Sequence, residues 1–318
     1  MRERRELRDK RREYRRLKQE LRAAGDAAGA DELRKKKSAA RDELREIEER
    51  LAAAMRRRSE GGSGALPHFV IVGASRSGTT SLYHLLTRHP LIEPAESKEL
   101  HFFDKHFGEG VGWYRSCFPP PARRDERTTI SGESTPYYLF HPHAARRMAQ
   151  TLPEARVLVL LRNPVDRAYS QYQQQVKRGR EPLPFEEAIR AEEQRLEGEW
   201  RRMSEDEGYD SFNLQRYSYL ARGVYADQLS RWRRFFADEQ MLVLRSEEFF
   251  ERPREALRRV VRFLDLPDWE PASRDVEDRR NRGVYAGGMD PRARERLEDY
   301  FGSHNRRLYD LLGTDFGW

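Results

Sequence analysis

Residues 69–86, FVIVGASRSGTTSLYHLL, constrain the fold of this chain more than any other stretch. The continuous apolar run 69–72 predicts a buried strand, and the pattern from Thr79 onwards predicts a helix. Gly73 and Gly78 allow a tight turn in which the backbone comes close to a ligand. A strand, a glycine-rich turn and a helix N-terminus in this order bind anions, because backbone N–H groups and the helix dipole point toward the ligand. The stretch therefore predicts a phosphate-binding loop.

The loop has no lysine where a nucleotide triphosphatase carries one. Thr79 occupies that position, and the basic residue of the loop, Arg76, comes three positions earlier. In triphosphatases the lysine contacts the β- and γ-phosphates beside a Ser or Thr that holds Mg²⁺. We therefore expect this loop to bind an anion other than a magnesium triphosphate. A turn without any ligand is the structural alternative for this stretch taken alone.

The rest of the chain after residue 67 alternates short apolar runs with helical patterns. Strands are predicted at 68–72, 128–131, 156–161 and 240–244. Helices are predicted at 79–88, 142–150, 164–177, 185–202, 225–236, 253–264 and 291–312. Strands that alternate with helices form βαβ units, and apolar runs such as VLVLL suit strands buried on both faces. We expect an α/β fold with a P-loop-like parallel sheet flanked by helices.

The first 58 residues read as a basic helical arm. Apolar residues at heptad-like spacing predict two helices joined near residues 25–31, as an α-helical hairpin or as a coiled coil with a partner, which would give a homodimer. A solvated helix with a thin apolar stripe is the alternative. Residues 59–66, which include SEGGSG, read as a flexible linker, and residues 67–318 as the main domain.

The charge distribution argues against nucleic acid as a partner. Residues 1–58 contain 21 Lys and Arg against 13 Asp and Glu, a net charge of +8, whereas the whole chain carries +7. The main domain is thus close to neutral, and the arm interleaves its basic residues with acidic ones.

The cysteine content and the hydropathy of the chain indicate its cellular compartment. Cys117 is the one cysteine of the chain, so no intramolecular disulfide can form, and no apolar run reaches the roughly 20 residues that span a bilayer. We expect a cytoplasmic protein without a transmembrane segment.

Seven motifs, in order along the chain, resemble the sulfotransferases that use 3′-phosphoadenosine 5′-phosphosulfate (PAPS). They are GASRSGTTSLYHLL (73–86), SKELHFF (97–103), WYRSCFP (113–119), GESTPYYL (132–139), LRNPVDRAYSQY (161–172), RGVYADQLSRW (222–232) and NRRLYDLLGTDFGW (305–318). Their pattern is most similar to the branch that contains heparan sulfate N- and 3-O-sulfotransferases and their bacterial relatives. The resemblance runs from about residue 67 to the end of the chain.

The resemblance implies how PAPS would be bound. The 5′-phosphosulfate would lie on the loop residues Ser75, Arg76, Ser77, Gly78, Thr79 and Thr80. The 3′-phosphate would contact Arg162 and Ser170, and Arg282 and Gly283 would belong to a loop that closes over the nucleotide. The product would be PAP, and no metal ion would be required.

The resemblance also implies catalytic roles. Glu99 matches the base that removes the acceptor proton, and Arg76 takes the place of the lysine that contacts the leaving oxygen. Arginine is always charged and forks to two oxygens, so Arg76 can stabilise the leaving phosphate but is not suited to donate a proton. His101 would orient or assist Glu99, from the same face of the segment if that segment is extended, or would be structural. Lys98 is a further candidate near the sulfuryl group.

The acceptor is implied only in outline, as a hydroxyl or amine of a carbohydrate or glycoconjugate. Ser134 stands where heparan-type enzymes often carry a substrate-binding lysine. Two other hypotheses stay open: a P-loop kinase or triphosphatase, and a non-catalytic nucleotide-binding scaffold with a coiled-coil arm.

Overall fold

The computed structural model describes residues 30–60, 64–124, 126–273 and 288–318, together with Glu6, Lys10, Glu13, Tyr14, Arg16, Leu17, Glu20 and Leu21. The chain divides into two compact units, Met1–Ser63 and Gly64–Trp318. Among the described residues, no helix is both long enough and apolar enough to cross a membrane.

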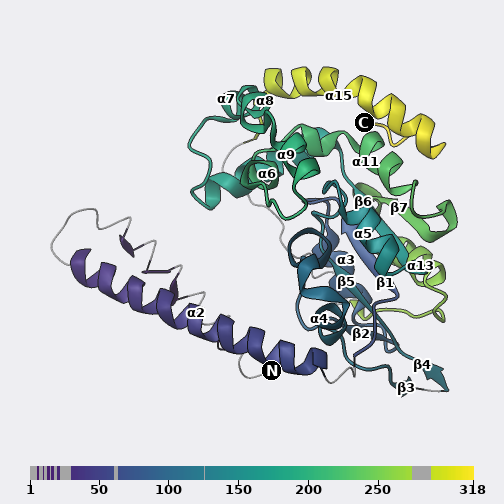
Figure 1. The fold of residues 1–318 in the computed structure, drawn as a ribbon. Helices are drawn as coiled ribbons and strands as arrows, with labels where there is room; N and C mark the ends of the chain where they lie inside the picture. Colours follow the sequence, from purple (N-terminus) through teal and green to yellow (C-terminus); the bar gives the residue numbers. More distant parts are fainter. Residues whose placement is uncertain are drawn as a thin grey trace. The chain divides into compact units, whose positions relative to one another are not determined.

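The first unit contains the long helix α2 (Ala30–Glu60), the dark ribbon of Figure 1. The described residues that precede it are helical and contact it in antiparallel order. Glu6 pairs with Arg50 at 3.0 Å, and Lys10 pairs with Glu43 at 2.6 Å. Leu17, Ala40 and Ile47 are buried in the same unit. These contacts make a helical hairpin within the chain, and α2 continues two residues past the predicted end of the arm.

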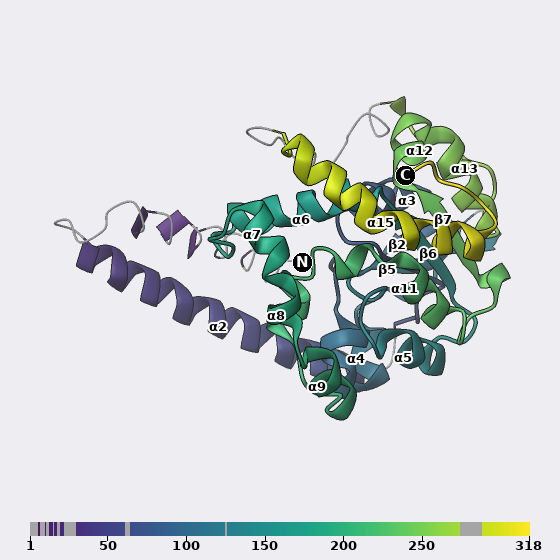
Figure 2. The same ribbon diagram turned by 90° about the horizontal axis from the view of Figure 1, so that it is seen from above.

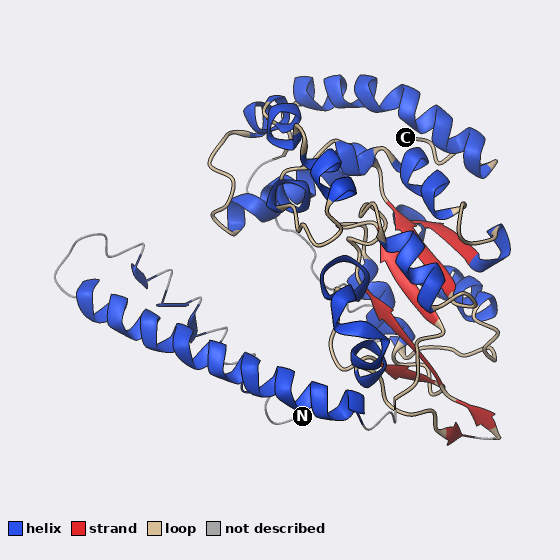
Figure 3. Cartoon of the chain, in the orientation of Figure 1, coloured by secondary structure: helices blue, strands red, loops and turns tan. Residues whose placement is uncertain are grey.

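The second unit is built on a five-stranded sheet with the strand order β2-β5-β1-β6-β7. The strands are β1 (Phe69–Gly73), β2 (Ile92–Pro94), β5 (Ile130–Ser134), β6 (Arg156–Leu161) and β7 (Met241–Arg245). Every neighbouring pair is parallel, so all carboxyl ends lie at one edge (Figure 3). A short antiparallel hairpin, β3 (Arg123–Arg124) and β4 (Arg127–Thr128), lies outside this sheet.

Helices cover both faces of the sheet, as Figure 2 shows for α13 on one side and α5 on the other. Phe69 and Ile71 of the central strand pack with the apolar residues of α3 and α13. Val70 and Val72 are also fully buried and, by strand alternation, face the opposite helices. This burial on both faces explains why the strand is apolar at every position.

The helices of the second unit are mostly short. Their bounds are α3 (Thr79–Leu86), α4 (Gly110–Ser116), α5 (Ala144–Thr151), α6 (Pro164–Lys177), α7 (Phe185–Arg190), α8 (Glu192–Leu196), α9 (Glu199–Glu205), α10 (Phe212–Arg216), α11 (Tyr225–Trp232), α12 (Ser246–Glu251), α13 (Pro253–Phe263) and α15 (Pro291–Leu312). Among the residues that the structure describes, this unit also has one π-helix, η1 (Phe102–His106), and three 3₁₀-helices, η2 (Phe107–Glu109), η3 (Ala221–Gly223) and η4 (Asp238–Gln240).

The predicted α/β class and parallel sheet are confirmed, and the bounds of β6, α6 and α15 agree with the prediction. The single helix predicted at 185–202 is wrong. The chain forms three short helices there because Gly198, at φ 72°, turns the backbone, and the buried carboxylate of Glu192 accepts hydrogen bonds from the amides of Leu220 and Ala221. The three-residue strand β2 was not predicted, since it is too short to show a period.

Candidate active site

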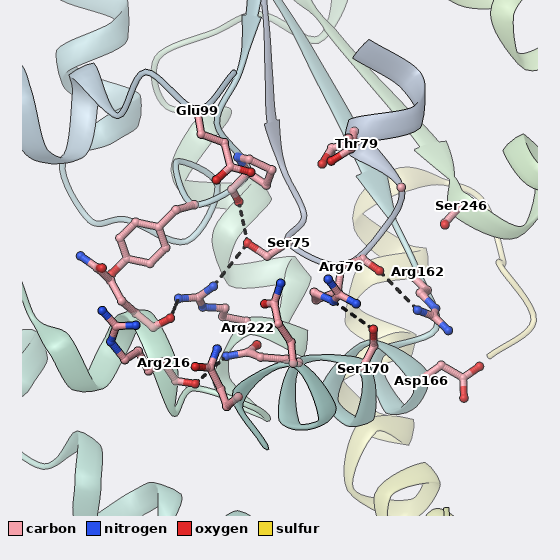
Figure 4. Close-up of a pocket in the computed structure, with 18 of the residues that line it drawn as sticks. Ser75, Arg76, Thr79, Glu99, Arg162, Asp166, Ser170, Arg216, Arg222 and Ser246 are labelled. Carbon is pink, nitrogen blue, oxygen red and sulfur yellow. Dashed lines mark hydrogen bonds between the residues drawn. The ribbon is translucent and has the colours of Figure 1, made fainter. Parts of the chain in front are cut away.

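A cavity of about 840 Å³ opens beside the carboxyl end of β1 and the loop that follows it. Its lining comes from six regions of the sequence: the loop 75–80, the segment 99–105, residues 136–137, residues 162–180 in and around helix α6, residues 215–222 and helix α12. The predicted residues that line it are Ser75, Arg76, Gly78, Thr79, Thr80, Glu99, His101, Arg162 and Ser170. Nine of the sequence-predicted residues thus gather in one cavity (Figure 4).

The loop has the shape of an anion cradle. Arg76 and Gly78 adopt left-handed backbone conformations, with φ 74° and 94°. A Cβ atom on Gly78 would lie 2.8 Å from the ring of Phe250, so glycine is required at this position. Helix α3 starts directly after it, and the first amides of a helix have no intrahelical acceptor. These amides are available to a phosphate group.

Two arginines and a serine meet at one end of the cradle. Arg76 Nε donates to Ser170 Oγ at 3.0 Å, and the Arg162 guanidinium donates to the Arg76 carbonyl at 3.3 Å. Helix α6 presents Ser170 there because Asn163 caps its first turn, accepting from Val165 N at 3.0 Å, and Pro164 starts it. The dashed contacts of Figure 4 show this group.

Two predicted site residues, Ser77 and Lys98, do not line the cavity, although Lys98 Nζ contacts the Glu99 carboxylate at 2.8 Å. Ser77 is fully buried; its amide donates to Ala74 and its carbonyl accepts from Ser246. Arg282 and Gly283 lie outside the described residues.

Glu99 lines another part of the same cavity, and a hydrogen bond from its backbone amide fixes its position. Its amide donates to the Ser134 carbonyl at 3.1 Å, and its side chain, 47% exposed, accepts from Lys98 Nζ at 2.8 Å. The segment is not extended, because Glu99 and His101 both adopt left-handed conformations, with φ 60° and 55°. His101 Nε2 nevertheless lies 3.9 Å from Glu99 Oε2.

The charges around Glu99 keep it ionised. Loss of solvation in the cavity raises its pKa, but the Lys98 charge and hydrogen bond, with His101 and Arg178, outweigh this and hold the pKa of Glu99 below its usual range. Desolvation lowers the pKa of His101. The Asp104 carboxylate, 2.7 Å from the ring, has the opposite effect and raises the pKa overall. An ionised carboxylate beside an oriented imidazole suits a general base.

A second carboxyl group, Glu133 at the end of β5, lies beneath this segment. It is fully buried and accepts hydrogen bonds from Tyr114 Oη at 2.6 Å, Thr135 Oγ1 at 2.8 Å and Tyr138 Oη at 3.2 Å. Tyr138 Oη in turn accepts from the Phe102 amide at 2.7 Å. The network ties the backbone that carries His101 to the sheet.

Sequence reasoning missed several residues of the site. Asp104 and Glu133 lie within the quoted motifs or beside them, but neither has a local signal, because their partners come from the tertiary fold. Arg222, in the motif RGVYADQLSRW, lines the cavity and was given no role. The basic side chains of Lys105, Arg178, Arg180 and Arg216, here termed the basic wall, also line the cavity.

Comparison with known proteins agrees with this geometry. The family model for the sulfotransferase domain matches residues 66–280. The "Membrane-associated sulfotransferase kil1" of Dictyostelium discoideum is 28% identical over 81% of this chain and 68% of its own length. The mouse "Heparan sulfate glucosamine 3-O-sulfotransferase 3B1" is 29% identical over 82% of this chain and 67% of its own.

Among solved structures, a sulfotransferase from Alicyclobacillus acidocaldarius is 32% identical, with a TM-score of 0.64 over 79% of this chain and 98% of that one. The domain match alone covers more than half of the chain, and it includes the loop, Glu99, Arg162 and Ser170. The chain therefore belongs to the sulfotransferase family.

Proposed function

We propose that this sulfotransferase takes its sulfuryl group from PAPS and transfers it to a hydroxyl or amine of a carbohydrate or glycoconjugate, with Glu99 as the base. One observation carries the proposal. A phosphate cradle with two arginines and an ionised carboxylate line the same cavity, although they come from segments far apart in the chain. The cradle suits the nucleotide phosphates and the carboxylate suits the acceptor proton.

Each group of residues has a separate role in an in-line transfer. Glu99 removes the proton of the acceptor as the acceptor atom forms its bond to sulfur. The bond between sulfur and the 5′-phosphate oxygen breaks, and its electron pair stays on that oxygen. Arg76 and the first amides of α3 are placed to stabilise this negative charge, which is greatest in the transition state. Arg162 and Ser170 are assigned to the 3′-phosphate.

The cavity favours an acceptor that carries negative charge. Burial lowers the pKa of Arg216, and the neighbouring Arg178 charge lowers it further. Burial also lowers the pKa of Arg180, and the charge of Arg216 lowers it further. Arginines that repel one another bind an anion favourably, because the anion relieves the repulsion. The mouse relative is named for heparan sulfate, an anionic glycan, which agrees with this preference.

The proposal also covers the cellular compartment of the protein and the role of its N-terminal arm. The chain has a single cysteine, Cys117, which is buried; this supports a reducing compartment, and we propose the cytoplasm. We also propose that the arm, residues 1–58, can mediate a homodimer, and that residues 59–66 link it to the sulfotransferase domain.

Transfer of ³⁵S from labelled PAPS tests the function. Heparan sulfate and a neutral oligosaccharide such as maltohexaose are offered at equal concentration, with wild type and Arg216→Gln. We expect label on the anionic glycan, and we expect Arg216→Gln to lower that transfer without creating transfer to the neutral sugar. Preference for the neutral sugar would contradict the acceptor class, and no transfer from PAPS to any glycan would contradict the proposed reaction.

A further inference from the structure

Arg222, on η3, is a buried cation on the wall of the cavity. Its side chain is 7% exposed. The guanidinium donates to Ser218 Oγ at 2.8 Å, to the Leu214 carbonyl at 2.9 Å and to the Gln215 carbonyl at 2.8 Å. These three bonds fix its plane, and all three acceptors are neutral.

The remaining end of the guanidinium points toward the phosphate loop. Its NH1 group donates to Ser75 Oγ at 3.3 Å, the longest of the four hydrogen bonds (Figure 4). A guanidinium has five N–H donors, so one N–H of NH1 is left over after these four bonds. The rings of Tyr137 and Phe140 lie against the guanidinium, with centroids 4.7 and 5.2 Å from its carbon.

Within the part of the chain that the structure describes, no carboxylate forms an ion pair with this guanidinium, and the charges of Glu192 and Asp104 act on it only from a distance. Burial lowers the pKa of Arg222 to about 10, so the side chain is still a cation at neutral pH. A buried cation without a counter-charge destabilises a fold unless something anionic pairs with it. Arg222 lines the cavity, so an anion bound there can reach this N–H.

The position of Arg222 separates it from the arginines assigned to phosphate. Arg162 donates to the Arg76 carbonyl and Arg76 donates to Ser170, whereas Arg222 donates to Ser75 at the start of the loop. Ser75 Oγ also lies 3.4 Å from the Pro136 carbonyl, and Pro136 and Glu99 line the same cavity. In Figure 4 Ser75 lies between Glu99 and Arg222.

We propose that Arg222 binds the peripheral oxygens of the sulfuryl group of PAPS and holds that group in line with the acceptor. The inference rests on the proposed donor. In the transfer, the acceptor atom forms a bond to sulfur while the bond from sulfur to the 5′-phosphate oxygen breaks, and the proton passes to Glu99. The peripheral oxygens stay negative throughout, so a fixed cation beside them binds the group and orients it for the transfer without accepting a proton.

The test compares the affinities of PAPS and PAP, which differ by the sulfuryl group. Calorimetry without acceptor measures both dissociation constants for wild type, Arg222→Met and Arg222→Lys. Arg222→Met should weaken PAPS binding by about 10-fold or more, the usual scale for losing a charged hydrogen bond, and leave PAP binding within about twofold. Arg222→Lys keeps the charge but not the planar group with several N–H donors. Its affinity for PAPS should lie between those of wild type and Arg222→Met.

The matched control is Arg231→Met. Arg231 is partly buried, donates to the Phe140 carbonyl at 3.0 Å and does not line the cavity, so both affinities should match wild type. If Arg222→Met does not fold, Arg222→Gln replaces it, since glutamine keeps N–H donors for the neighbouring carbonyls but carries no charge.

Equal losses for PAPS and PAP, or no loss for either, would overturn the role of Arg222. Failure of wild type to bind PAP and PAPS at all would instead contradict the proposed donor. The two failures are therefore distinguishable in one experiment.

Discussion

Replacing Glu133 by glutamine should change how the stability of the protein depends on pH. Burial raises the pKa of this carboxyl from 4.5 to about 7, despite three hydroxyl donors. Between these pH values the folded chain holds a proton that the unfolded chain has released, so the free energy of unfolding falls as pH rises. The penalty is near zero below pH 4.5 and reaches about 3 kcal/mol above pH 7, because each pKa unit corresponds to about 1.4 kcal/mol.

Urea unfolding at pH 5 and pH 8, followed by tryptophan fluorescence, measures this penalty. Glutamine does not titrate, so Glu133→Gln should gain about 2 to 3 kcal/mol relative to wild type on going from pH 5 to pH 8. Any cost of altered hydrogen bonds is present at both pH values and cancels. Glu192, whose pKa burial also raises to about 7, contributes equally to both proteins.

The matched control is Glu109→Gln, an exposed glutamate on η2. It should follow the wild-type pH dependence. A stability difference between Glu133→Gln and wild type that is the same at pH 5 and pH 8 would refute the reasoning, since it would mean that Glu133 does not titrate in this range.

Four further predictions concern the site and the arm. Glu99→Gln should lower kcat by about 10²- to 10⁴-fold, the range for a general base, with PAP affinity unchanged; wild-type turnover would remove Glu99 from that role. Because the pKa of Glu99 is held below 4.5, the acid limb of the wild-type kcat profile should lie below that pH, and a limb near pH 6 would contradict this assignment. Arg76→Lys should keep or raise activity while Arg76→Ala loses orders of magnitude, and an active alanine variant would show that backbone amides suffice. Sedimentation of the full chain against residues 64–318 should show a dimer for the full chain alone, and equal masses would argue against dimerisation through the arm.

The sequence predicted the elements whose signals are local. Residues 157–161 are all apolar, and α6 begins with Asn163 as its cap and Pro164 as its first residue, so the strand and the start of the helix could be predicted. The phosphate loop was predicted for the same reason, since strand, glycines and helix follow one another directly.

The parts that were not predicted depend on contacts between distant segments. The left-handed conformations of Glu99 and His101 accompany hydrogen bonds to Ser134 and Thr135, which lie more than 30 positions later in the chain. The guanidinium of Arg222 lies beside Ser75 although 147 positions separate them. No periodicity in a single segment carries this information.

The central claim is that the cavity binds a 3′-phosphoadenosine nucleotide as the donor for sulfuryl transfer. Calorimetry of the full chain with PAP, and separately with ATP and Mg²⁺, tests it most directly, because the resemblance assigns Arg162 and Ser170 to a 3′-phosphate that ATP lacks. We predict tight binding of PAP without added metal and much weaker binding of ATP. Tighter binding of ATP with Mg²⁺ than of PAP would contradict the account.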